Sequence, residues 1–227
     1  MPLHLLTGAG SGIGAVLADR LHARGDALVL LARSAERAGD LARAYPGATT
    51  VVADLADPAT VDRLELPERL DSVVHAAGVV DLGPVASLST ASWLEQLTVN
   101  LVAPAALTRL ALPALRAARG TVVLVNSGAG LFAHPDWSAY AASKQGLKAL
   151  ADSLRAEEAE HGVRVTSVFP GRTATAMQEK VHAQEGKAYD AADWIRPETV
   201  VDAIVHVLDL PRDATISDLT VRPGPRT

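Results

Sequence analysis

The sequence predicts an α/β protein built on a doubly wound parallel sheet of about seven strands, with helices on both faces. Short apolar runs alternate with helical patterns from one end of the chain to the other. A glycine-rich turn joins the first apolar run to the first helical pattern. The chain has 227 residues, a length that suits one α/β domain, so we treat residues 1–227 as a single domain.

The predicted strands are nearly continuous in apolar residues, as expected of strands that are buried on both faces. They are Leu3–Leu6, Ala27–Leu31, Thr49–Val52, Ser72–His75, Thr121–Val125, Arg164–Val168 and Leu219–Val221.

The segments between the strands carry apolar residues at helical spacing. The predicted helices are Ile13–Arg24, Ala35–Ala44, Ala59–Leu64, Ser89–Ala118, Ala139–His161 and Glu198–Leu208. Pro104 and Pro113 predict bends within the fourth of these helices. Residues 172–196 form the longest stretch without a predicted strand, which is typical of a functional loop, and we expect a substrate loop or short lid there.

Composition excludes several classes of function. The net charge is −5 with scattered acidic residues, so we expect no nucleic-acid partner. The absence of cysteine excludes disulfides, thiolate catalysis and cysteine-based metal sites, and no histidine spacing resembles a metal site. The N-terminus lacks the pattern of a signal peptide, and no run approaches the roughly 18 apolar residues of a membrane helix. We therefore expect no metal, no membrane partner and a cytoplasmic location.

The segment Thr7-Gly8-Ala9-Gly10-Ser11-Gly12-Ile13-Gly14 lies between the first strand and the first helix. Missing side chains at such a turn let backbone N–H groups approach a pyrophosphate at the helix N-terminus. A tight strand–helix turn without a ligand is the alternative. The position in the first βα unit favours the phosphate site, with contacts from Gly8, Gly10, Ser11, Gly12, Ile13 and Gly14.

Arg33 follows the second strand, where an acidic residue would bind the ribose 2′-hydroxyl of NAD. An arginine can instead bind the 2′-phosphate of NADP through charge-assisted hydrogen bonds, although a solvated surface arginine is the alternative. Asp54 and Leu55, after the third strand, are further candidate cofactor contacts, with Asp54 placed to bind adenine or to serve as a cap or turn residue.

Tyr140 and Lys144 are four residues apart near the start of a helix, so both lie on one helix face. A free phenol has a pKa near ~10 and is a poor acid or base at neutral pH. A fixed ammonium nearby stabilises the phenolate and lowers that pKa. The spacing therefore indicates general acid/base chemistry, although the same pair occurs by chance on many helix surfaces.

These motifs resemble the short-chain dehydrogenase/reductase family, whose Rossmann-type fold matches the sheet predicted above. The glycine turn matches the family's Thr-Gly-x-x-x-Gly-x-Gly, and Tyr140 with Lys144 matches its Tyr-x-x-x-Lys. Ser127, at the end of the fifth strand, stands where the family keeps its catalytic serine, and Asn100 matches its helix-four asparagine. Pro170-Gly171, followed by Thr173 and Thr175, resembles the loop that binds the nicotinamide carboxamide.

The resemblance implies a role for each of these residues. Tyr140 would be the general acid in reduction, Ser127 would hold the substrate oxygen, and Lys144 would bind the nicotinamide ribose. Asn100 would hold a water that links Lys144 to solvent. Taken singly, Ser127 could be a strand-end turn residue and Asn100 a residue that satisfies a helix kink. A homodimer or homotetramer is also implied.

One departure from the family lies after the fourth strand, where His75-Ala76-Ala77-Gly78 replaces the usual Asn-Asn-Ala-Gly. Two amide side chains are lost, which puts the tether between this strand and its neighbours in doubt. Ala77 and Gly78 still permit close approach of the adenine ribose, and we expect His75 to be buried and hydrogen-bonded. The candidate substrate-pocket residues are Leu131, His134, Trp137, Met177 and Trp194.

The sequence therefore predicts an oxidoreductase that prefers NADP(H), with NAD(H) as an alternative cofactor, and that acts on a small-molecule carbonyl or alcohol substrate. A non-catalytic dinucleotide-binding or redox-sensing module on the same fold is the main alternative, because fold alone does not decide function. The sequence does not identify the substrate.

Overall fold

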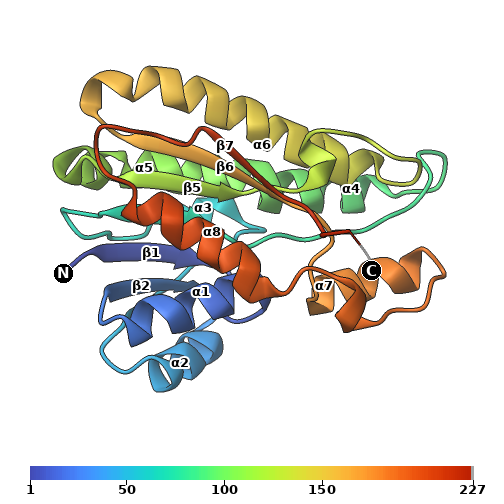
Figure 1. Ribbon diagram of the computed structural model, residues 1–227, viewed down its shortest axis with the longest axis horizontal. Coiled ribbons are helices and arrows are strands. Elements are labelled where there is room, and N and C mark those ends of the chain that lie inside the picture. Colours follow the sequence, from blue (N-terminus) through green and yellow to red (C-terminus); the bar gives the residue numbers. More distant parts are fainter. Residues whose placement is uncertain (226–227) are drawn as a thin grey trace.

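The computed structural model describes residues 1–225 and contains a parallel sheet of seven strands in the order β3-β2-β1-β4-β5-β6-β7 (Figure 1). The predicted doubly wound sheet is confirmed. The strands are β1 (Leu3–Thr7), β2 (Ala27–Ala32), β3 (Thr49–Val52), β4 (Ser72–His75), β5 (Thr121–Val125), β6 (Arg164–Pro170) and β7 (Asp218–Val221).

Helices cover both faces of this sheet, as the alternation of strands and helices requires (Figure 1). They are α1 (Gly12–Ala23), α2 (Ala35–Ala44), α3 (Pro58–Val61), α4 (Thr90–Leu97), α5 (Ala103–Ala118), α6 (Ser138–Glu157), α7 (Ala176–Gln184) and α8 (Pro197–Asp209).

Each face of the sheet has its own apolar core. On one face, α1, α2 and α8 contribute Leu17, Leu41 and Ile204. On the other face, α5 and α6 contribute Leu107 and Leu147. Because side chains alternate between the two faces of a strand, the central strands β4 and β5 are buried along their whole length.

The chain reverses its direction of winding between β1 and β4, which are hydrogen-bonded neighbours at the centre of the sheet. In open parallel sheets, ligands bind outside the carboxyl ends of the strands at such a switch point. Helix α7 lies beyond these carboxyl ends, apart from the two helical layers (Figure 1). The topology therefore places the functional end of the molecule beside α7.

The long fourth helix differs from the prediction in its distortion. It runs from α4 into α5 through a π-helical turn at Thr98–Val102, where the N–H of Ala103 donates to the carbonyl of Thr98. Pro104 has no N–H to donate to the carbonyl four residues earlier, so the regular α-helical pattern cannot continue through this point. The irregularity is therefore a π turn just before Pro104, and Asn100 lies inside it.

Two further segments depart from the prediction. The third helix was expected at Ala59–Leu64, but α3 ends at Val61. Leu64 and Leu66 both pack on the core, and a spacing of two residues suits extended chain rather than a helix. Within residues 172–196, the expected loop contains α7, whose first turn is capped by the hydroxyl of Thr175, which accepts from the N–H of Gln178.

The helix Thr90–Ala118 is long and apolar enough to cross a membrane, which the sequence reading had not expected. Its most apolar window has a mean hydropathy of 1.3, and 44% of that window is buried inside the protein. Leu107, Ala111 and Leu115 are fully buried in the core of the α5 face. Packing against the sheet therefore accounts for part of the apolar character of this helix.

Candidate active site

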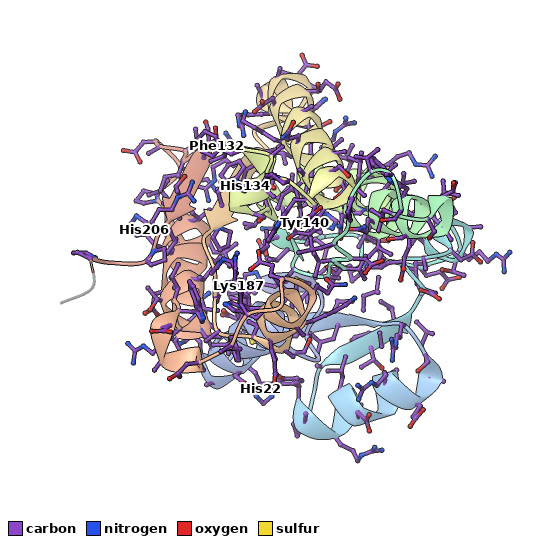
Figure 2. The ribbon with its side chains drawn as sticks, turned by 90° about the vertical axis from the view of Figure 1, so that its right-hand side faces the viewer. His22, Phe132, His134, Tyr140, Lys187 and His206 are labelled. Carbon is purple, nitrogen blue, oxygen red and sulfur yellow. The ribbon has the colours of Figure 1, made fainter. Side chains whose placement is uncertain are left out.

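A cavity of about 950 Å³ lies at the carboxyl ends of the central strands. Its walls come from the turns that follow β1, β4, β5 and β6, and from α6 and α7. Figure 2 looks onto this end of the molecule and shows Phe132, His134, Tyr140 and Lys187 gathered on it. The cavity therefore stands where the doubly wound topology predicts a ligand site.

The glycine-rich turn is held in place by close backbone contacts that exclude side chains. Gly8 has a φ of +76°, and a Cβ there would lie 2.7 Å from the N of Ala77. A Cβ on Gly14 would collide with the carbonyl of Gly8. Both glycines are therefore required by the packing of the turn against β4 and α1.

The N-terminus of α1 opens toward the cavity. The hydroxyl of Ser11, the N-cap residue, makes no capping hydrogen bond, and the first turn holds no acidic residue. A Cβ built on Gly10 meets nothing within 4 Å, and one on Gly12 would lie 3.3 Å from Cγ2 of Thr175. Free N–H groups at a helix N-terminus, with open space before them, fit the pyrophosphate of a dinucleotide.

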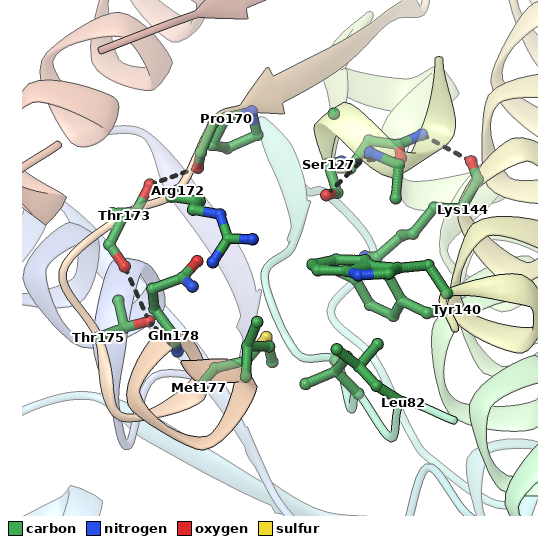
Figure 3. A pocket seen from close by; sticks show the side chains of 18 of the residues that line it. Leu82, Ser127, Tyr140, Lys144, Pro170, Arg172, Thr173, Thr175, Met177 and Gln178 are labelled. Carbon is green, nitrogen blue, oxygen red and sulfur yellow. Dashed lines mark hydrogen bonds between the residues drawn. The ribbon is translucent and has the colours of Figure 1, made fainter. Parts of the chain in front are cut away.

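Tyr140, Ser127 and Lys144 meet on one wall of the cavity (Figure 3). The Ser127 hydroxyl accepts a hydrogen bond from the N–H of Ala129 at 3.2 Å and also interacts with the Tyr140 phenol. The Nζ of Lys144 lies 5.9 Å from the Tyr140 ring centroid and donates to the carbonyl of Val125 at 3.1 Å. Ser127 is thus both a turn residue and a partner of the phenol.

The pKa values of this wall are set mainly by burial. Burial raises the pKa of Tyr140, and the hydrogen bond with Ser127 offsets only part of this rise. Burial lowers the pKa of Lys144 to about 8, so its ammonium is still mostly charged at pH 7. The expected lowering of the Tyr140 pKa by Lys144 is therefore not seen in this structure, where burial and the hydrogen bond with Ser127 set the pKa of the phenol.

Asn126 connects two of the three residues on this wall and was missed by sequence reasoning. Its Oδ1 accepts from the N–H of Ser127 at 2.8 Å, and its Nδ2 donates to the carbonyl of Lys144 at 3.0 Å. A Cβ on Gly130 would collide with the Asn126 amide, so the loop is closely fitted around it. The only signal in the sequence is a polar residue directly after a buried strand.

Asn100 is buried behind the cavity wall. Its amide donates to the carbonyl of Val79 and accepts from the N–H of Val79, both at 2.9 Å, and it donates to the Ser143 hydroxyl at 3.0 Å. A Cβ on Gly78 would lie 3.2 Å from Asn100 Oδ1 and 3.7 Å from Lys144 Nζ, so the amide lies near the lysine. The amide bonds to the loop after β4 and to α6, not to its own helix.

Side-chain hydrogen bonds from β1 and α5 hold the end of β4, where the two amides of the family pattern are absent. The hydroxyl of Thr7 accepts hydrogen bonds from the N–H groups of Ala76 and Ala77, both at 3.1 Å, and so ties β1 to the end of β4. His75 is buried, and its Nε2 lies 2.9 Å from the Thr108 hydroxyl on α5. The expectation of a buried, hydrogen-bonded His75 is confirmed.

Most of the predicted cofactor residues line the cavity. They are Gly8, Ser11, Gly12, Ile13, Ala77, Gly78, Tyr140, Lys144, Pro170, Gly171, Thr173 and Thr175. The others lie behind its walls or beyond its edge. They are Gly10, Gly14, Arg33, Asp54, Leu55 and Asn100.

Arg33 and Asp54 differ in what surrounds them. Arg33 is exposed after β2, and within residues 1–225 it makes no ion pair or side-chain hydrogen bond. The carboxylate of Asp54 accepts from the N–H of Ala56 at 2.9 Å, so the turn role is present in this structure. Of the two charged side chains, Arg33 is therefore the one without a hydrogen-bond partner within residues 1–225.

The substrate side of the cavity is partly as predicted. His134, Trp137 and Met177 line it, whereas Leu131 and Trp194 do not. The Trp194 ring packs against the His182 ring. Three further lining residues, Arg172, Gln178 and Lys187, belong to the segment 172–196 that was predicted as a substrate loop, although they were not singled out. No signal in the sequence points to Leu82, Phe132 and Arg222, which long-range folding brings to the cavity.

A glycine-rich turn on a doubly wound sheet, with a tyrosine and a lysine on one cavity wall, defines the class of nicotinamide-dependent oxidoreductases. The family model for the short chain dehydrogenases matches residues 3–186. The chain belongs to this family, whose members are oxidoreductases that act on small molecules.

Three known proteins illustrate this membership. Dehydrogenase/reductase SDR family member 7B of Bos taurus is 34% identical over 205 residues, which are 83% of this chain and 63% of that protein. An uncharacterized oxidoreductase of Staphylococcus aureus is 27% identical over 96% of both chains. The crystal structure of an oxidoreductase from Burkholderia thailandensis is 32% identical, with a TM-score of 0.84 over 97% of this chain and 91% of that one.

Proposed function

We propose that this protein is a carbonyl reductase or alcohol dehydrogenase that prefers NADP(H) and uses Tyr140 as its general acid and base. The proposal rests on one observation above all. Ser127, Tyr140 and Lys144 come from β5 and α6 to the same wall of a cavity that also opens onto the glycine-rich turn. A proton donor, a hydrogen bond to hold the substrate oxygen and a fixed cation thus face one space.

The roles follow from these positions. Ser127 holds the substrate oxygen beside the phenol, and Tyr140 donates its proton to that oxygen during reduction. The buried ammonium of Lys144, held by the carbonyl of Val125, stabilises the phenolate that remains. The nicotinamide cofactor, when bound, supplies or accepts the hydride.

The Lys144 ammonium alone does not bring the phenol into a useful range, because burial raises the Tyr140 pKa. The positive charge of an oxidised nicotinamide would add a second cation to this wall and favour the phenolate. Asn100 lies close behind Lys144 and is the residue that we assign to holding a water in the proton path.

The proposed preference for NADP(H) rests on Arg33. No acidic residue ends β2, and Arg33 is an exposed cation without a partner within the described residues. A guanidinium in that position suits the 2′-phosphate, whereas NAD would find no carboxylate for its 2′-hydroxyl. Pro170, Gly171, Thr173 and Thr175 would hold the nicotinamide, and Ala77 and Gly78 the adenine ribose.

The proposal also includes an oligomer and a cytoplasmic location. Leu94 on α4 and Val102 before α5 are large apolar side chains that are 60% and 47% exposed. Burying such side chains against a second copy would remove apolar surface from water. We accordingly propose a homodimer or homotetramer, which light scattering coupled to size-exclusion chromatography would test.

The first experiment measures the oxidation of NADPH, with NADH in parallel, against a panel of aldehydes, ketones and diketones. We expect turnover that is faster with NADPH, and Tyr140→Phe should lower kcat by about 10²- to 10⁴-fold while NADPH still binds. Tyr45→Phe is the matched control, because Tyr45 lies on the far side of α1 and bonds to Asp19. Retained turnover in Tyr140→Phe would refute the mechanism, and tight NADPH binding without any turnover would favour the non-catalytic module.

A further inference from the structure

Arg172 places its guanidinium inside the cavity on the wall opposite Tyr140 and Ser127 (Figure 3). The residue directly follows Pro170-Gly171 at the end of β6. Its Cζ lies 5.8 Å from the ring centroid of Trp137 and 5.5 Å from that of Trp194. Two indole rings thus fix the charged group, which is favourable for a cation over an aromatic face.

The guanidinium has more donors than the protein uses. Within residues 1–225 its one hydrogen-bond acceptor is Glu185, with 2.6 Å between Nη2 and Oε1. Glu185 also pairs with Lys187 at 3.2 Å, so two cations share a single carboxylate. A guanidinium carries five N–H donors, and within residues 1–225 only one hydrogen bond from Arg172 to a protein acceptor is formed, while the residue lines the cavity.

This charge lies close to the proposed chemistry. The Trp137 ring that contacts Arg172 also contacts the Tyr140 ring edge to face, at 5.8 Å between centroids. A single indole therefore separates the guanidinium from the catalytic phenol. Tyr140 and Arg172 line the same cavity, so one small molecule can contact both.

Besides apolar side chains, the cavity lining holds the cations Lys187 and Arg222, the carboxylates Asp136 and Glu185 and the amides of Gln178 and Gln184. Arg222 lines it from the other side, with Nη1 3.1 Å from a Cβ built on Gly128, and has no ion pair within the described residues. Leu82, Phe132 and Met177 supply apolar surface between the charged groups. Such a lining suits a short carbon chain that ends in an anion.

We propose that Arg172 binds the carboxylate of the substrate, so that the preferred substrates are small oxo acids and the corresponding hydroxy acids. This inference rests on the proposed function. The bond to Glu185 already shows that this guanidinium donates to a carboxylate at hydrogen-bond distance. A substrate carboxylate uses the donors that Glu185 leaves free, in the bidentate geometry that guanidinium and carboxylate share.

The test compares ketones that differ only in charge. Phenylglyoxylate, acetoacetate and 4-oxopentanoate are each assayed beside their methyl esters, so that the distance between carbonyl and carboxylate varies across the pairs. We expect the wild-type protein to prefer the acid in at least one pair by about tenfold or more in kcat/KM. In Arg172→Gln that acid-to-ester ratio should fall by about 10- to 100-fold, mainly through the KM of the acid.

Glu185→Gln separates substrate binding from a merely structural ion pair. If Arg172 binds the substrate carboxylate, Glu185→Gln frees a donor and should maintain or raise the acid-to-ester ratio, whereas Arg172→Gln lowers it. If the pair only holds α7 in place, both variants lose activity together on acids and esters alike, which would overturn the inference. Arg196→Gln is the control, because Arg196 is exposed and lies outside the cavity lining.

Two readouts keep this inference distinct from the proposed function. Turnover of esters at least as fast as acids, with an unchanged ratio in Arg172→Gln, refutes the inference and leaves the reductase standing. Absence of turnover with every acid and ester refutes the reductase. Calorimetric titration of the same acids into the NADPH-saturated protein then decides the inference, which fails if wild-type and Arg172→Gln bind them equally or not at all. Weaker NADPH binding in Arg172→Gln would assign the guanidinium to the cofactor and overturn the inference.

Discussion

The buried His75 makes the stability of the fold depend on pH in a way that can be calculated. Burial lowers the pKa of His75 from 6.5 to about 4, and the nearby Lys144 charge adds to this effect. The unfolded chain therefore takes up a proton between pH 6.5 and 4 that the folded protein does not. The stabilisation is fully present above pH 6.5 and is lost as the pH falls toward 4.

The size of the effect follows from the shift. Each unit of pKa difference corresponds to roughly 1.4 kcal/mol, so a shift of about two and a half units gives about 3 kcal/mol in total. Between pH 7 and pH 5 the expected loss is about 2 kcal/mol of the free energy of unfolding. His75→Asn keeps a polar side chain that can face the Thr108 hydroxyl but cannot titrate in this range.

Urea unfolding followed by tryptophan fluorescence at pH 7 and pH 5 measures this difference. The drop in unfolding free energy should be about 2 kcal/mol smaller in His75→Asn than in the wild-type protein, whatever the absolute stabilities are. Comparing the two proteins cancels contributions from groups that they share, including His4, whose pKa burial also lowers. His206→Asn, an exposed change on α8, should behave as the wild type does. Equal drops in wild type and His75→Asn would refute the assignment of a neutral, buried His75.

Two further changes test the cofactor site and the catalytic wall. Arg33→Asp should lower the NADPH-to-NADH ratio of kcat/KM by about 10- to 100-fold, because a carboxylate repels the 2′-phosphate, and an unchanged ratio would remove Arg33 from the site. The exposed Arg63→Asp is its control. Asn126→Ala leaves the N–H of Ser127 unpaired and removes the side-chain bond to the carbonyl of Lys144, so the unfolding free energy in urea should fall by about 1–3 kcal/mol and kcat should fall with it. Full stability and turnover in Asn126→Ala would show that these bonds do not position the wall.

The features that could be predicted from the sequence are those with a local cause. The apolar runs specify buried strands, and their alternation with helices specifies the parallel sheet, because a parallel pair needs a crossover connection. The glycine turn and the four-residue spacing of Tyr140 and Lys144 also depend only on neighbours in the chain. Most of the cofactor residues that were predicted from these motifs line one cavity in the structure.

Other features depend on residues that are distant in the sequence. The shortening of α3 follows from the packing of Leu64 and Leu66 on the core. The hydrogen bonds from the N–H groups of Ala76 and Ala77 to the Thr7 hydroxyl form because β1 and β4 are neighbours in the sheet. The residues next to Thr7 in the sequence do not predict these hydrogen bonds.

The sequence by itself determined the class of fold, the glycine-rich turn and the tyrosine–lysine pair, since each depends on the spacing of residues a few positions apart. Only the tertiary structure decided which charges line the cavity. Arg172, Glu185 and Trp137 lie far apart in the chain, and they meet because β6, α7 and the loop before α6 converge at the carboxyl edge of the sheet. The chemistry of the substrate cavity is therefore a property of the packing of loops, which local sequence patterns do not encode.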